Sequence, residues 1–455
     1  MKVLLVGGGA REHIIAESLH KNGASIIVAM KNSNPGILEL SGSGPDDWFE
    51  GPETDVSTIA EWAKNKDVDF AIIGLEDPLG VGICNSLERV GIPTVGPRKK
   101  PAEIEGSKLF ARSLMERHNI PGQIEYFATK DISALEDYIT ESDGELVLKP
   151  IGLTAGKGVK VMGDQLVSKE DAKEYGRKII KESIGGFHEV LIEEKLYGEE
   201  FVIQCFVDGV HVVPMPTVKD YKRAREGNKG SNTGGMGSYS QSDGLLPFLS
   251  KEEYQDSVDI IEQVVLALKD EGHEYKGILY GQFMLTNNGI KVIEFNSRFG
   301  DPECMNVLSL LKTNFVDVCK DIINGTLEKS QIEFAKKSTV CKYIVPKGYG
   351  ETPLENAEIC LDEEKIEELG AKIYFAKVNK SKKCLLTTTS RSIGIVGIGD
   401  TIEEAEEVAE KSISFISGKF SVRHDIGKAT LINNEIRNIH NLRSVPENVL
   451  ATNIS

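Results

Sequence analysis

Short β-rich runs alternate with helical patterns from residue 3 to residue 97 of this chain. The runs are VLLV at 3–6, IIVA at 26–29 and FAII at 70–73. Such alternation favours right-handed βαβ units and therefore a parallel sheet covered by helices. Ligand-binding loops are expected at the C-terminal ends of these strands. We predict an N-terminal parallel α/β domain over residues 1–105.

The rest of the chain follows other patterns. Ser107 is suited to cap a helix at 108–118, and two short strands around a glycine-rich loop predict a small lid over residues 120–195. Asp208-Gly209 predicts a hairpin, so the sheet becomes antiparallel there. A last αβ segment covers 336–430, and the tail at 431–455 has no readable role. The predicted fold class is α/β and α+β multidomain, with units at 1–105, 106–335 and 336–430.

Acidic residues outnumber basic ones, 70 against 53, and the net charge is −17. This balance argues against a broad nucleic-acid or anionic-membrane surface, so any phosphate site must be local. The seven cysteines are scattered, without a CxxC pair, as in proteins of a reducing cytosol. No segment approaches the roughly 20 apolar residues of a membrane-spanning helix. We expect a soluble, cytoplasmic protein with no nucleic-acid or membrane partner.

The segment GGGAREH at 7–13 follows the first strand and opens a helix. Its backbone N–H groups and the helix dipole are suited to a phosphate, although the glycines are also explained by a tight turn alone. The segment is a poor dinucleotide fingerprint, because Glu12 stands where the third glycine belongs. Glu76 and Asp77 follow another strand of the same sheet, where their carboxylates are candidates for contacts with hydroxyl groups of the same ligand, and charges at a helix N-terminus are an equal alternative.

A second glycine-rich loop, at 152–158, does not have the spacing of a P-loop. Preceded by Lys149, it is still suited to fold over a triphosphate, and a flexible hairpin is the alternative. The EEKL segment at 193–196 leaves a strand before Gly198-Glu199-Glu200, as in a linker that meets an adenine edge and is followed by a carboxylate for the ribose hydroxyls. Charged residues at a strand end are also commonly just solvated.

Two strands at 281–285 and 290–296 are separated by Asn287-Asn288-Gly289, which predicts a hairpin. With a three-residue loop, Gln282 lies opposite Glu294, and Asn296 lies on the same face. Oxygen ligands on one face suit Mg²⁺, whereas a solvated face is the alternative. Arg298 adds a permanent charge beside this face.

Five segments together resemble the phosphoribosylamine-glycine ligases, also called glycinamide ribonucleotide synthetases, of the ATP-grasp superfamily. They are GGGAREH at 7–13, EGSK at 105–108, the lid at 149–159, NTGGMGSY at 232–239 and EFNSRFGDPE at 294–303. The chain departs from the commoner family pattern at Leu75, at Pro150-Ile151 and at Gln282. The resemblance implies a phosphoribosylamine-binding domain at 1–105, an ATP-grasp domain at 106–335 and a C-terminal domain at 336–430 that closes over the amine site.

The residues and the resemblance together lead to four sets of expected functional residues. The expected ATP contacts are Lys108, Lys149, Gly156, Lys157, Gly158, Glu193, Glu194, Lys195, Leu196 and Glu200. The expected contacts to phosphoribosylamine or glycine are Gly8, Gly9, Arg11, Glu12, Glu76, Asp220 and Arg298. The expected metal ligands are Gln282, Glu294 and Asn296. The expected catalytic residues are Arg298, which would steady the acyl-phosphate oxyanion, Lys149 and Lys108.

The reaction implied by the resemblance is ATP-dependent ligation of glycine to 5-phosphoribosylamine through glycyl phosphate, a step of purine biosynthesis. ATP would be a substrate, with two Mg²⁺ or Mn²⁺ ions as cofactors. One alternative is another ATP-grasp carboxylate-amine ligase, which would lack the GGGAREH and NTGGMGSY segments. The other is a non-catalytic nucleotide-binding regulatory protein, which the lysines and the metal-type face disfavour. The sequence leaves the oligomeric state open.

Overall fold

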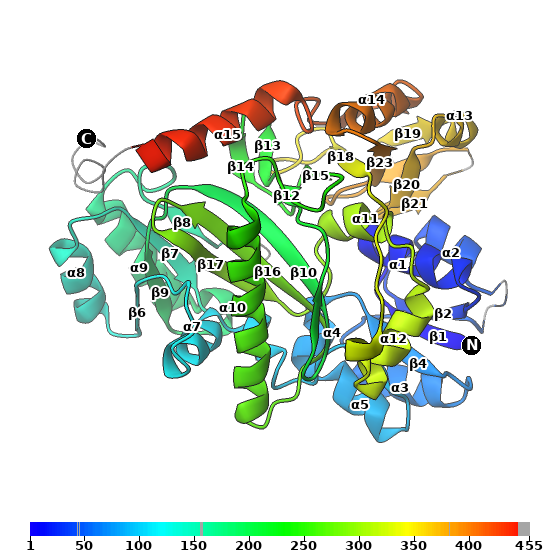
Figure 1. The fold of residues 1–455 in the computed structure, drawn as a ribbon, viewed down its shortest axis with the longest axis horizontal. Helices are drawn as coiled ribbons and strands as arrows, with labels where there is room; N and C mark the ends of the chain where they lie inside the picture. Colours follow the sequence, from blue (N-terminus) through cyan, green and yellow to red (C-terminus); the bar gives the residue numbers. More distant parts are fainter. Residues whose placement is uncertain (43, 45, 155–157, 382, 445–455) are drawn as a thin grey trace.

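The computed structural model describes residues 1–42, 44, 46–154, 158–381 and 383–444. Its N-terminal part is a five-stranded parallel sheet in the order β3-β2-β1-β4-β5, as the alternating pattern predicted (Figure 1). The strands are β1 (Lys2–Val6), β2 (Ser25–Met30), β3 (Trp48–Glu50), β4 (Phe70–Ile73) and β5 (Thr94–Val95). The helices are α1 (Ala10–Lys21), α2 (Pro35–Leu40), α3 (Val56–Lys64), α4 (Glu76–Val81), α5 (Ile83–Arg89) and α6 (Glu103–Gly106). Because β1 lies between β2 and β4, the loops that follow β1 and β4 meet at the switch point where open α/β sheets bind ligands.

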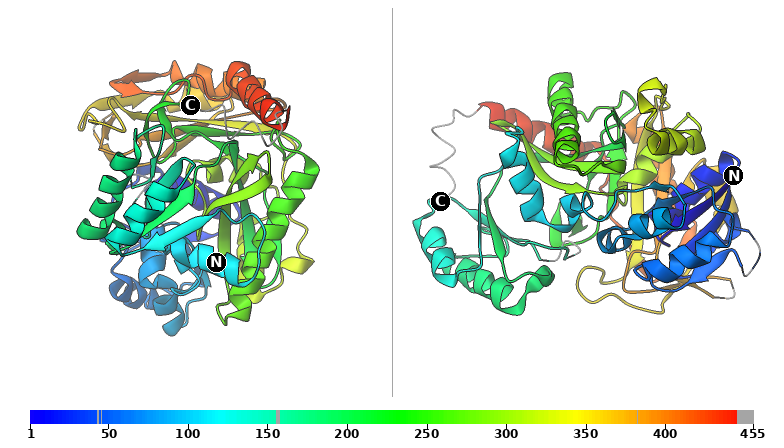
Figure 2. Two further views of the ribbon diagram at one scale, coloured as in Figure 1. Left: turned by 90° about the vertical axis from the view of Figure 1, so that its left-hand side faces the viewer. Right: turned by 90° about the horizontal axis from the view of Figure 1, so that it is seen from below.

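A small four-stranded sheet in the order β6-β9-β7-β8 forms the region predicted as a lid. It comprises β6 (Tyr126–Thr129), α8 (Ile132–Glu141), β7 (Leu146–Pro150), β8 (Lys160–Val161), α9 (Lys169–Glu182), η1 (Ile184–Gly186) and β9 (Val190–Glu194). Helices α8 and α9 pack together, and the region has an apolar core of its own. It projects from the body on the side away from the N-terminal sheet (Figure 2). Helix α7 (Lys108–Arg117) precedes it and is capped by Ser107, whose hydroxyl accepts from Phe110 N, as predicted.

The body is an antiparallel sheet in the order β11-β10-β16-β17, with the 20-residue helix α10 (Lys251–Asp270) packed against it. Its strands are β10 (Glu199–Asp208), β11 (Val212–Pro214), β16 (Lys276–Thr286) and β17 (Gly289–Asn296). The predicted hairpin after β10 is present, but Val207 pairs with Val212, so its connection is longer than the Asp208-Gly209 dipeptide suggested. Asp208 Oδ1 accepts from the backbone N–H groups of Val210 and His211 across this turn.

The β16–β17 hairpin differs from its predicted register at the turn. Thr286 pairs with Gly289, so the loop contains two residues and not three. A register shift between Gln282 and Phe283 then makes Ile293 an extra residue on β17. This bulge compensates for the shorter loop, and Gln282 still pairs with Glu294.

A third large sheet combines strands from distant parts of the chain, in the order β12-β15-β18-β23-β20. Strands β12 (Lys219–Asp220) and β15 (Gly237–Ser240) come from the middle of the chain, whereas β18 (Ser338–Pro346), β20 (Lys372–Phe375) and β23 (Ile393–Gly399) come from its C-terminal part. The nearby helices are α11 (Glu303–Leu308), α12 (Phe315–Asn324), η2 (Leu327–Lys329) and α14 (Ile402–Ile413). A separate hairpin consists of β13 (Arg223–Arg225) and β14 (Lys229–Asn232). The middle segment is therefore built into the C-terminal sheet.

The remaining elements are β19 (Glu358–Leu361), α13 (Glu363–Glu368), β21 (Val378–Lys380), β22 (Leu385–Thr387), β24 (Ile416–Gly418), β25 (Phe420–Ser421) and α15 (Ala429–Ser444). Helix α15, within the tail that had no predicted role, runs along the top of the body (Figure 1). An apolar cluster joins N-terminal, central and C-terminal segments, since it contains Val3, Ile203 and Val340. No helix among the described residues is long and apolar enough to cross a membrane.

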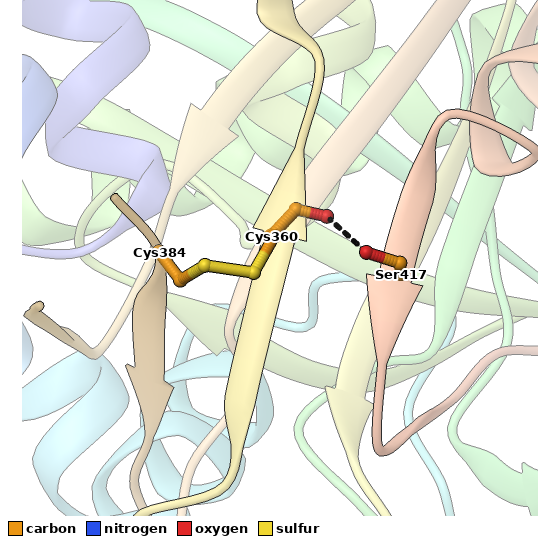
Figure 3. The surroundings of a disulfide bond; sticks show 3 residues. All are labelled: Cys360, Cys384 and Ser417. Atoms are coloured by element: carbon orange, nitrogen blue, oxygen red, sulfur yellow. Dashed lines mark hydrogen bonds between the residues drawn. A yellow bond between two sulfur atoms is a disulfide. The ribbon is translucent and has the colours of Figure 1, made fainter. Parts of the chain in front are cut away.

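Cys360 and Cys384 form a disulfide between β19 and the start of β22 (Figure 3). The disulfide differs from the expectation for a reducing cytosol, in which all cysteines would be free thiols. Ile359 pairs with Leu385 in the antiparallel ladder, so the two cysteines are directly opposed. No sequence pattern indicates this pairing, because it depends on the register of the two strands at these cysteines, 24 residues apart.

Strand β23 and helix α14 approach each other closely at Gly397. A Cβ atom there would overlap the carbonyl oxygen of Ala405. We predict that Gly397→Ala lowers the free energy of unfolding by about 1–3 kcal/mol or more, because the backbones must move apart. Gly80→Ala, in α4 with no atom near its Cβ position, should be neutral or stabilising by up to about 1 kcal/mol. Thermal melts of both variants test this, and equal melting temperatures would contradict it.

Candidate active site

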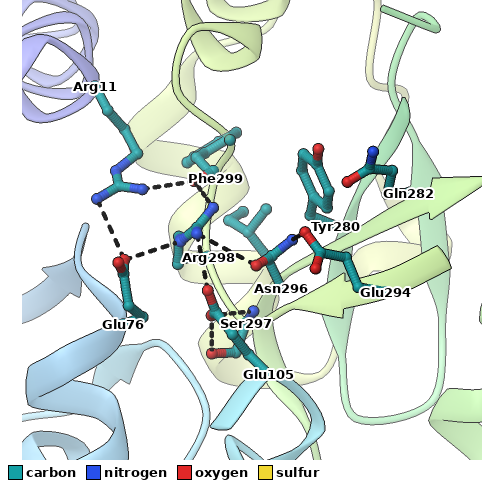
Figure 4. Close-up of polar contacts among 12 residues, drawn as sticks. Arg11, Glu76, Glu105, Tyr280, Gln282, Glu294, Asn296, Ser297, Arg298 and Phe299 are labelled. Atoms are coloured by element: carbon teal, nitrogen blue, oxygen red, sulfur yellow. Dashed lines mark hydrogen bonds and ion pairs between the residues drawn. The ribbon is translucent and has the colours of Figure 1, made fainter. Parts of the chain in front are cut away.

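Three oxygen-bearing side chains lie side by side on β16 and β17 (Figure 4). Gln282 pairs with Glu294, and Asn296 Nδ2 is 3.5 Å from Glu294 Oε1. Among the described residues no group of three His, Cys, Asp or Glu side chains is arranged to hold a metal. One carboxylate with two amide oxygens nevertheless suits Mg²⁺, which normally takes its other ligands from water and substrate phosphates. The donor set thus fits the predicted metal site.

Ammonium groups surround Glu294. Burial alone would raise the pKa of its carboxyl, but Lys222, Lys108 and Lys149 together hold that pKa below its usual value. The carboxylate is therefore ionised at neutral pH. A positively charged surround of this kind is suited to a polyanion such as a triphosphate.

Lys149 is held by a buried counterion. Its Nζ is 2.5 Å from Glu193 Oε2, and Arg112 Nε is 2.7 Å from Glu193 Oε1. Despite burial, the two cations lower the pKa of Glu193 to about 2. Both oxygens of Glu193 are thus committed to cations inside the protein. The Glu193 side chain therefore orients Lys149. The predicted contact of Glu193 to ATP stays a prediction.

Lys108 connects the first turn of α7 to the glycine-rich loop. Its Nζ donates to the Gly152 carbonyl at 3.1 Å, and its backbone N–H donates to Ile151 O at 3.0 Å. At the other end of the loop, Gly158 O accepts from the Tyr175 hydroxyl. The predicted ATP contacts Gly156 and Lys157 lie outside the described residues. Lys108 and Lys149 therefore lie on either side of the loop base, beside Glu294.

The segment from Glu194 to Glu200 links the lid sheet to the body sheet. Lys195 is tied to the lid, since its Nζ contacts Glu145 Oε2 at 2.5 Å and Met162 O at 3.0 Å. Leu196 follows in a half-buried position. Glu200 starts the body strand, where its Oε2 accepts from Gln282 Nε2 at 2.6 Å. Glu200, predicted as a ribose contact, thus lies next to the predicted metal ligands.

The N-terminal glycine loop connects β1 to α1. Gly7 has φ of +123°, whereas Gly9 has an ordinary φ of −96°. Gly9 N donates to Glu12 Oε2 at 2.6 Å, and the other oxygen of this buried carboxylate accepts from Arg11 Nε at 2.7 Å. Since Glu12 already occupies one donor of the helix N-terminus, a phosphate at this loop would use N–H groups other than that of Gly9. Asn32 closes the neighbouring side by donating to Gly8 O at 2.8 Å.

Arg298 joins the N-terminal loops to the metal-type face (Figure 4). Its guanidinium contacts Glu76 Oε2 at 3.1 Å, Glu105 Oε1 at 2.8 Å and Asn296 Oδ1 at 3.3 Å. Arg11 lies 3.8 Å from the same Glu76 carboxylate. Burial raises the pKa of Glu76, but Arg298 and Arg11 outweigh it and lower the value to about 2. The structure thus brings Arg11, Glu76, Asn296 and Arg298 into one network.

Two further residues of this region, Glu105 and Lys222, were not among the expected functional residues, whereas Asp220 was. Glu105 Oε2 accepts from the backbone and the hydroxyl of Ser297 at 2.8 Å, which fixes the turn before Arg298. Lys222 Nζ donates to Gln282 Oε1 at 2.6 Å. Burial and the nearby Glu303 raise the pKa of Asp220 well above its usual value, although Lys222 opposes the shift. The alternation of Asp220 and Lys222 just before the NTGGMGSY segment was the available sequence signal.

Asp220 has a buried oxygen, Oδ1, with no hydrogen-bond partner among the residues described. Gly235 packs directly against this oxygen, because a Cβ atom at Gly235 would lie 3.1 Å from it and 3.2 Å from Arg391 NH1. Arg391 in turn donates to the carbonyls of Gly234 and Asp301 and pairs with the Asp301 carboxylate at 2.8 Å. A residue from the C-terminal sheet thus closes this side of the site.

The cysteine thiols are not suited to covalent catalysis. The five unpaired cysteines are all buried. Burial raises the pKa of the Cys84 thiol to about 12, and it raises the pKa of the Cys205 thiol further. Because the thiolate is the nucleophile, such groups are inert at neutral pH. The chemistry of this site therefore depends on charged and amide groups.

Comparisons with known proteins agree along the length of the chain. Residues 1–105, 106–304 and 339–429 match the family models described as the N domain, the ATP-grasp (A) domain and the C domain of phosphoribosylglycinamide synthetase. Phosphoribosylamine-glycine ligases of Methanocella arvoryzae and Methanocaldococcus jannaschii are 48% and 47% identical over 446 and 448 residues. Both alignments cover 97% of this chain and 100% of the relative.

Solved structures give the same picture. A phosphoribosylamine-glycine ligase from Thermotoga maritima superposes with a TM-score of 0.78 at 27% identity, covering 93% of this chain and 100% of that one. A biotin carboxylase from Campylobacter jejuni reaches a TM-score of 0.72 at 14% identity, covering 97% and 98%. At that identity the second similarity is one of fold alone.

The buried Glu193 carboxylate predicts a dependence of stability on acid. Its pKa is about 2 in the folded chain against an ordinary value of 4.5, so its contribution of about 3 kcal/mol is present above pH 4.5 and is lost as pH falls toward 2. We expect Glu193→Gln to be destabilised at pH 7, because two buried cations lose their counterion. It should also lose less stability than the parent chain between pH 4.5 and 3.

Urea midpoints measured from pH 7 to pH 3 test this dependence. The depressed pKa of Glu76 is still present in the variant, so some acid loss should remain. Glu252→Gln, at an exposed position of α10, is the matched control and should follow the parent curve. Parallel curves for Glu193→Gln and the parent chain would contradict the assignment.

Proposed function

Because this chain belongs to the phosphoribosylglycinamide synthetase family, we propose that it joins glycine to 5-phosphoribosylamine while ATP is cleaved to ADP and phosphate. The observation that carries the proposal is the arrangement around Arg298. Arg298 contacts Asn296, which lies next to Glu294 and its three neighbouring lysines. It also contacts Glu76, at the loops that follow the strands of the parallel sheet. One half is suited to phosphoryl transfer, and the other half is suited to a phosphorylated amine.

Amide formation needs an activated carboxyl group, because an oxide ion is not a feasible leaving group. In the first step a glycine carboxylate oxygen attacks the γ-phosphorus of ATP, and the bond to the bridging oxygen breaks to release ADP. In the second step the amine nitrogen of phosphoribosylamine attacks the carbonyl carbon of glycyl phosphate. Phosphate leaves and the nitrogen loses a proton, so atoms and charges balance.

Charged residues of the body supply electrostatic stabilisation for the first step. Lys108 and Lys149 bind phosphate oxygens at the base of the glycine-rich loop, with Glu193 orienting Lys149. Gln282, Glu294 and Asn296 would hold the divalent cations, proposed as two Mg²⁺ or Mn²⁺ ions, which would supply charge neutralisation at the phosphates. A site of fixed charges of this kind needs little reorganisation during the reaction.

The N-terminal sheet and Arg298 serve the second step. Gly8, Gly9, Arg11, Glu12 and Glu76 form the phosphoribosylamine side, and Asp220 with Arg298 forms the glycine side. Arg298 is the catalytic residue that steadies the acyl-phosphate oxygen. Because Glu76 and Glu105 fix its guanidinium, its orientation is set before substrates bind.

The linker from lid to body is the proposed adenosine site. Glu194, Lys195 and Leu196 meet the adenine edge, and Glu200 binds the ribose hydroxyls. Gly156, Lys157 and Gly158 of the loop cover the phosphates. The corresponding domain limits are 1–105 for the amine domain, 106–335 for the ATP-grasp domain with its lid at 120–195, and 336–430 for the C-terminal domain.

Isotope transfer tests the reaction directly. The chain is mixed with ATP, phosphoribosylamine and glycine whose carboxylate carries ¹⁸O. An acyl-phosphate route transfers one labelled oxygen to each phosphate released. Amide formation with unlabelled phosphate would exclude glycyl phosphate, and ATP cleavage without amide formation would exclude the ligase proposal.

Glu294→Gln is expected to lower the rate of amide formation at least a hundredfold. The variant keeps the shape of the side chain but removes the charge that offsets three lysines and serves the cation. Steady-state ADP release at saturating Mg²⁺ is the measurement, and Glu252→Gln is the exposed glutamate control. A rate within threefold of the parent chain would remove Glu294 from the metal site.

A further inference from the structure

Helix α15 inserts a buried carboxylate behind the active site. Glu435 is only 3% exposed, and its two oxygens accept from the hydroxyls of Tyr221 and Tyr239, at 2.5 Å and 2.8 Å. The match to the C domain of the family ends at residue 429, so Glu435 lies beyond that matched segment. The helix is nevertheless attached to the center of the molecule.

Tyr221 stands between two residues of the site. Asp220 precedes it, with a buried oxygen that has no partner in the described part of the chain, and Lys222 follows it, with its Nζ 2.6 Å from Gln282 Oε1. Alternate residues of an extended chain point to opposite sides. A contact that fixes Tyr221 on the outer side therefore also fixes Asp220 and Lys222 on the inner side.

The backbone of this segment continues past β12 along residues 233–237, where Lys222 O accepts from Thr233 N and from the Thr233 hydroxyl, both at 2.8 Å. Strand β12 contains two residues, and beyond it Tyr221 is held by its N–H to Gly237 O at 3.0 Å and by Met236 N to its carbonyl at 2.7 Å. Its ring lies 5.2 Å from the buried Arg423 guanidinium. Glu435 therefore holds the Tyr221 side chain at its hydroxyl end.

A second link from α15 reaches the same strand. Asn438 donates to Glu199 Oε1 at 2.9 Å, and Glu199 Oε2 accepts from Lys219 Nζ at 2.8 Å. Lys219 pairs with Tyr239 in the β12–β15 ladder. The helix therefore contacts Tyr221 and Tyr239 directly and reaches Lys219 through Glu199.

We propose that Glu435 is a positioning residue for the ligase reaction, which holds Asp220 and Lys222 in place through the Tyr221 hydroxyl. The proposal rests on the proposed function for its kinetic consequence. Helix α15 is then a part of the active-site structure and not a mere terminal extension. Displacement of Tyr221 moves Lys222 away from Gln282 without altering the lid contacts of Lys108 and Lys149.

Kinetics of Glu435→Ala separate positioning from simple destabilisation. We expect kcat to fall at least tenfold and the KM for glycine to rise, while the KM for ATP changes less than twofold. Glu435→Gln keeps one acceptor and should recover kcat to within threefold of the parent chain. Asn434→Ala, at an exposed position of the same helix, is the control and should match the parent chain.

A double-variant cycle identifies the route. If Glu435 acts through the Tyr221 hydroxyl, adding Tyr221→Phe to Glu435→Ala should cause no further loss. Multiplicative losses in the double variant would overturn this route. An unchanged kcat in Glu435→Ala would overturn the proposal. So would a kcat that falls only in proportion to the folded fraction, with the KM values for glycine and ATP unchanged.

Hydrogen exchange tests the same contact without substrates. The amides of residues 219–222 should exchange at least tenfold faster in Glu435→Ala than in the parent chain, and equal rates would overturn the proposal. If the parent chain forms no amide product, the proposed function fails, while this exchange result still decides whether Glu435 holds the segment.

Discussion

The buried guanidinium of Arg298 is the contact on which the arrangement of the site depends. It is shared by Glu76 at the end of a parallel strand, Glu105 before α7 and Asn296 on the metal-type face. Removing either Glu76 or Glu105 would leave this largely buried charge with one carboxylate partner instead of two, which destabilises the folded chain. The N-terminal sheet and the body hairpin are therefore held in one relative position. Because the two reacting groups would bind on these separate parts, this contact sets the distance between them.

The same principle recurs elsewhere in the site: a buried charge is held by a partner from a distant segment. Glu193 of the lid sheet fixes Lys149, Lys222 from the middle segment fixes Gln282, and Glu435 fixes the tyrosine next to Lys222. Each pairing restricts one side chain and also connects two elements. The antiparallel sheet in which β12 pairs with β15, and β15 with the C-terminal strand β18, provides the frame for the last two contacts. The site is thus a product of the whole chain, which agrees with the relatives being similar along their full length.

Local patterns predicted the parallel sheet, the Ser107 cap and the lid sheet, because each depends on neighbours in sequence. The pairing of Gln282 with Glu294 was predicted from a register that is wrong at the turn, and the bulge at Ile293 corrects it. Contacts across long separations could not be predicted in this way. Lys222 meets Gln282 across 60 residues, and Tyr221 meets Glu435 across 214. The Cys360–Cys384 pair depends on strand register, which periodicity does not determine.

We propose that the Arg298 network aligns the amine domain with the site of ATP cleavage. The most direct test is the ratio of ADP to amide formed by Glu76→Gln, which weakens only the end of the network that belongs to the N-terminal domain. The parent chain should form one ADP per amide. In the variant the amine of phosphoribosylamine should be misaligned, so that water hydrolyses part of the glycyl phosphate. The amount of ADP formed should then exceed the amount of amide at least twofold. A one-to-one ratio at the parental rate would contradict the claim.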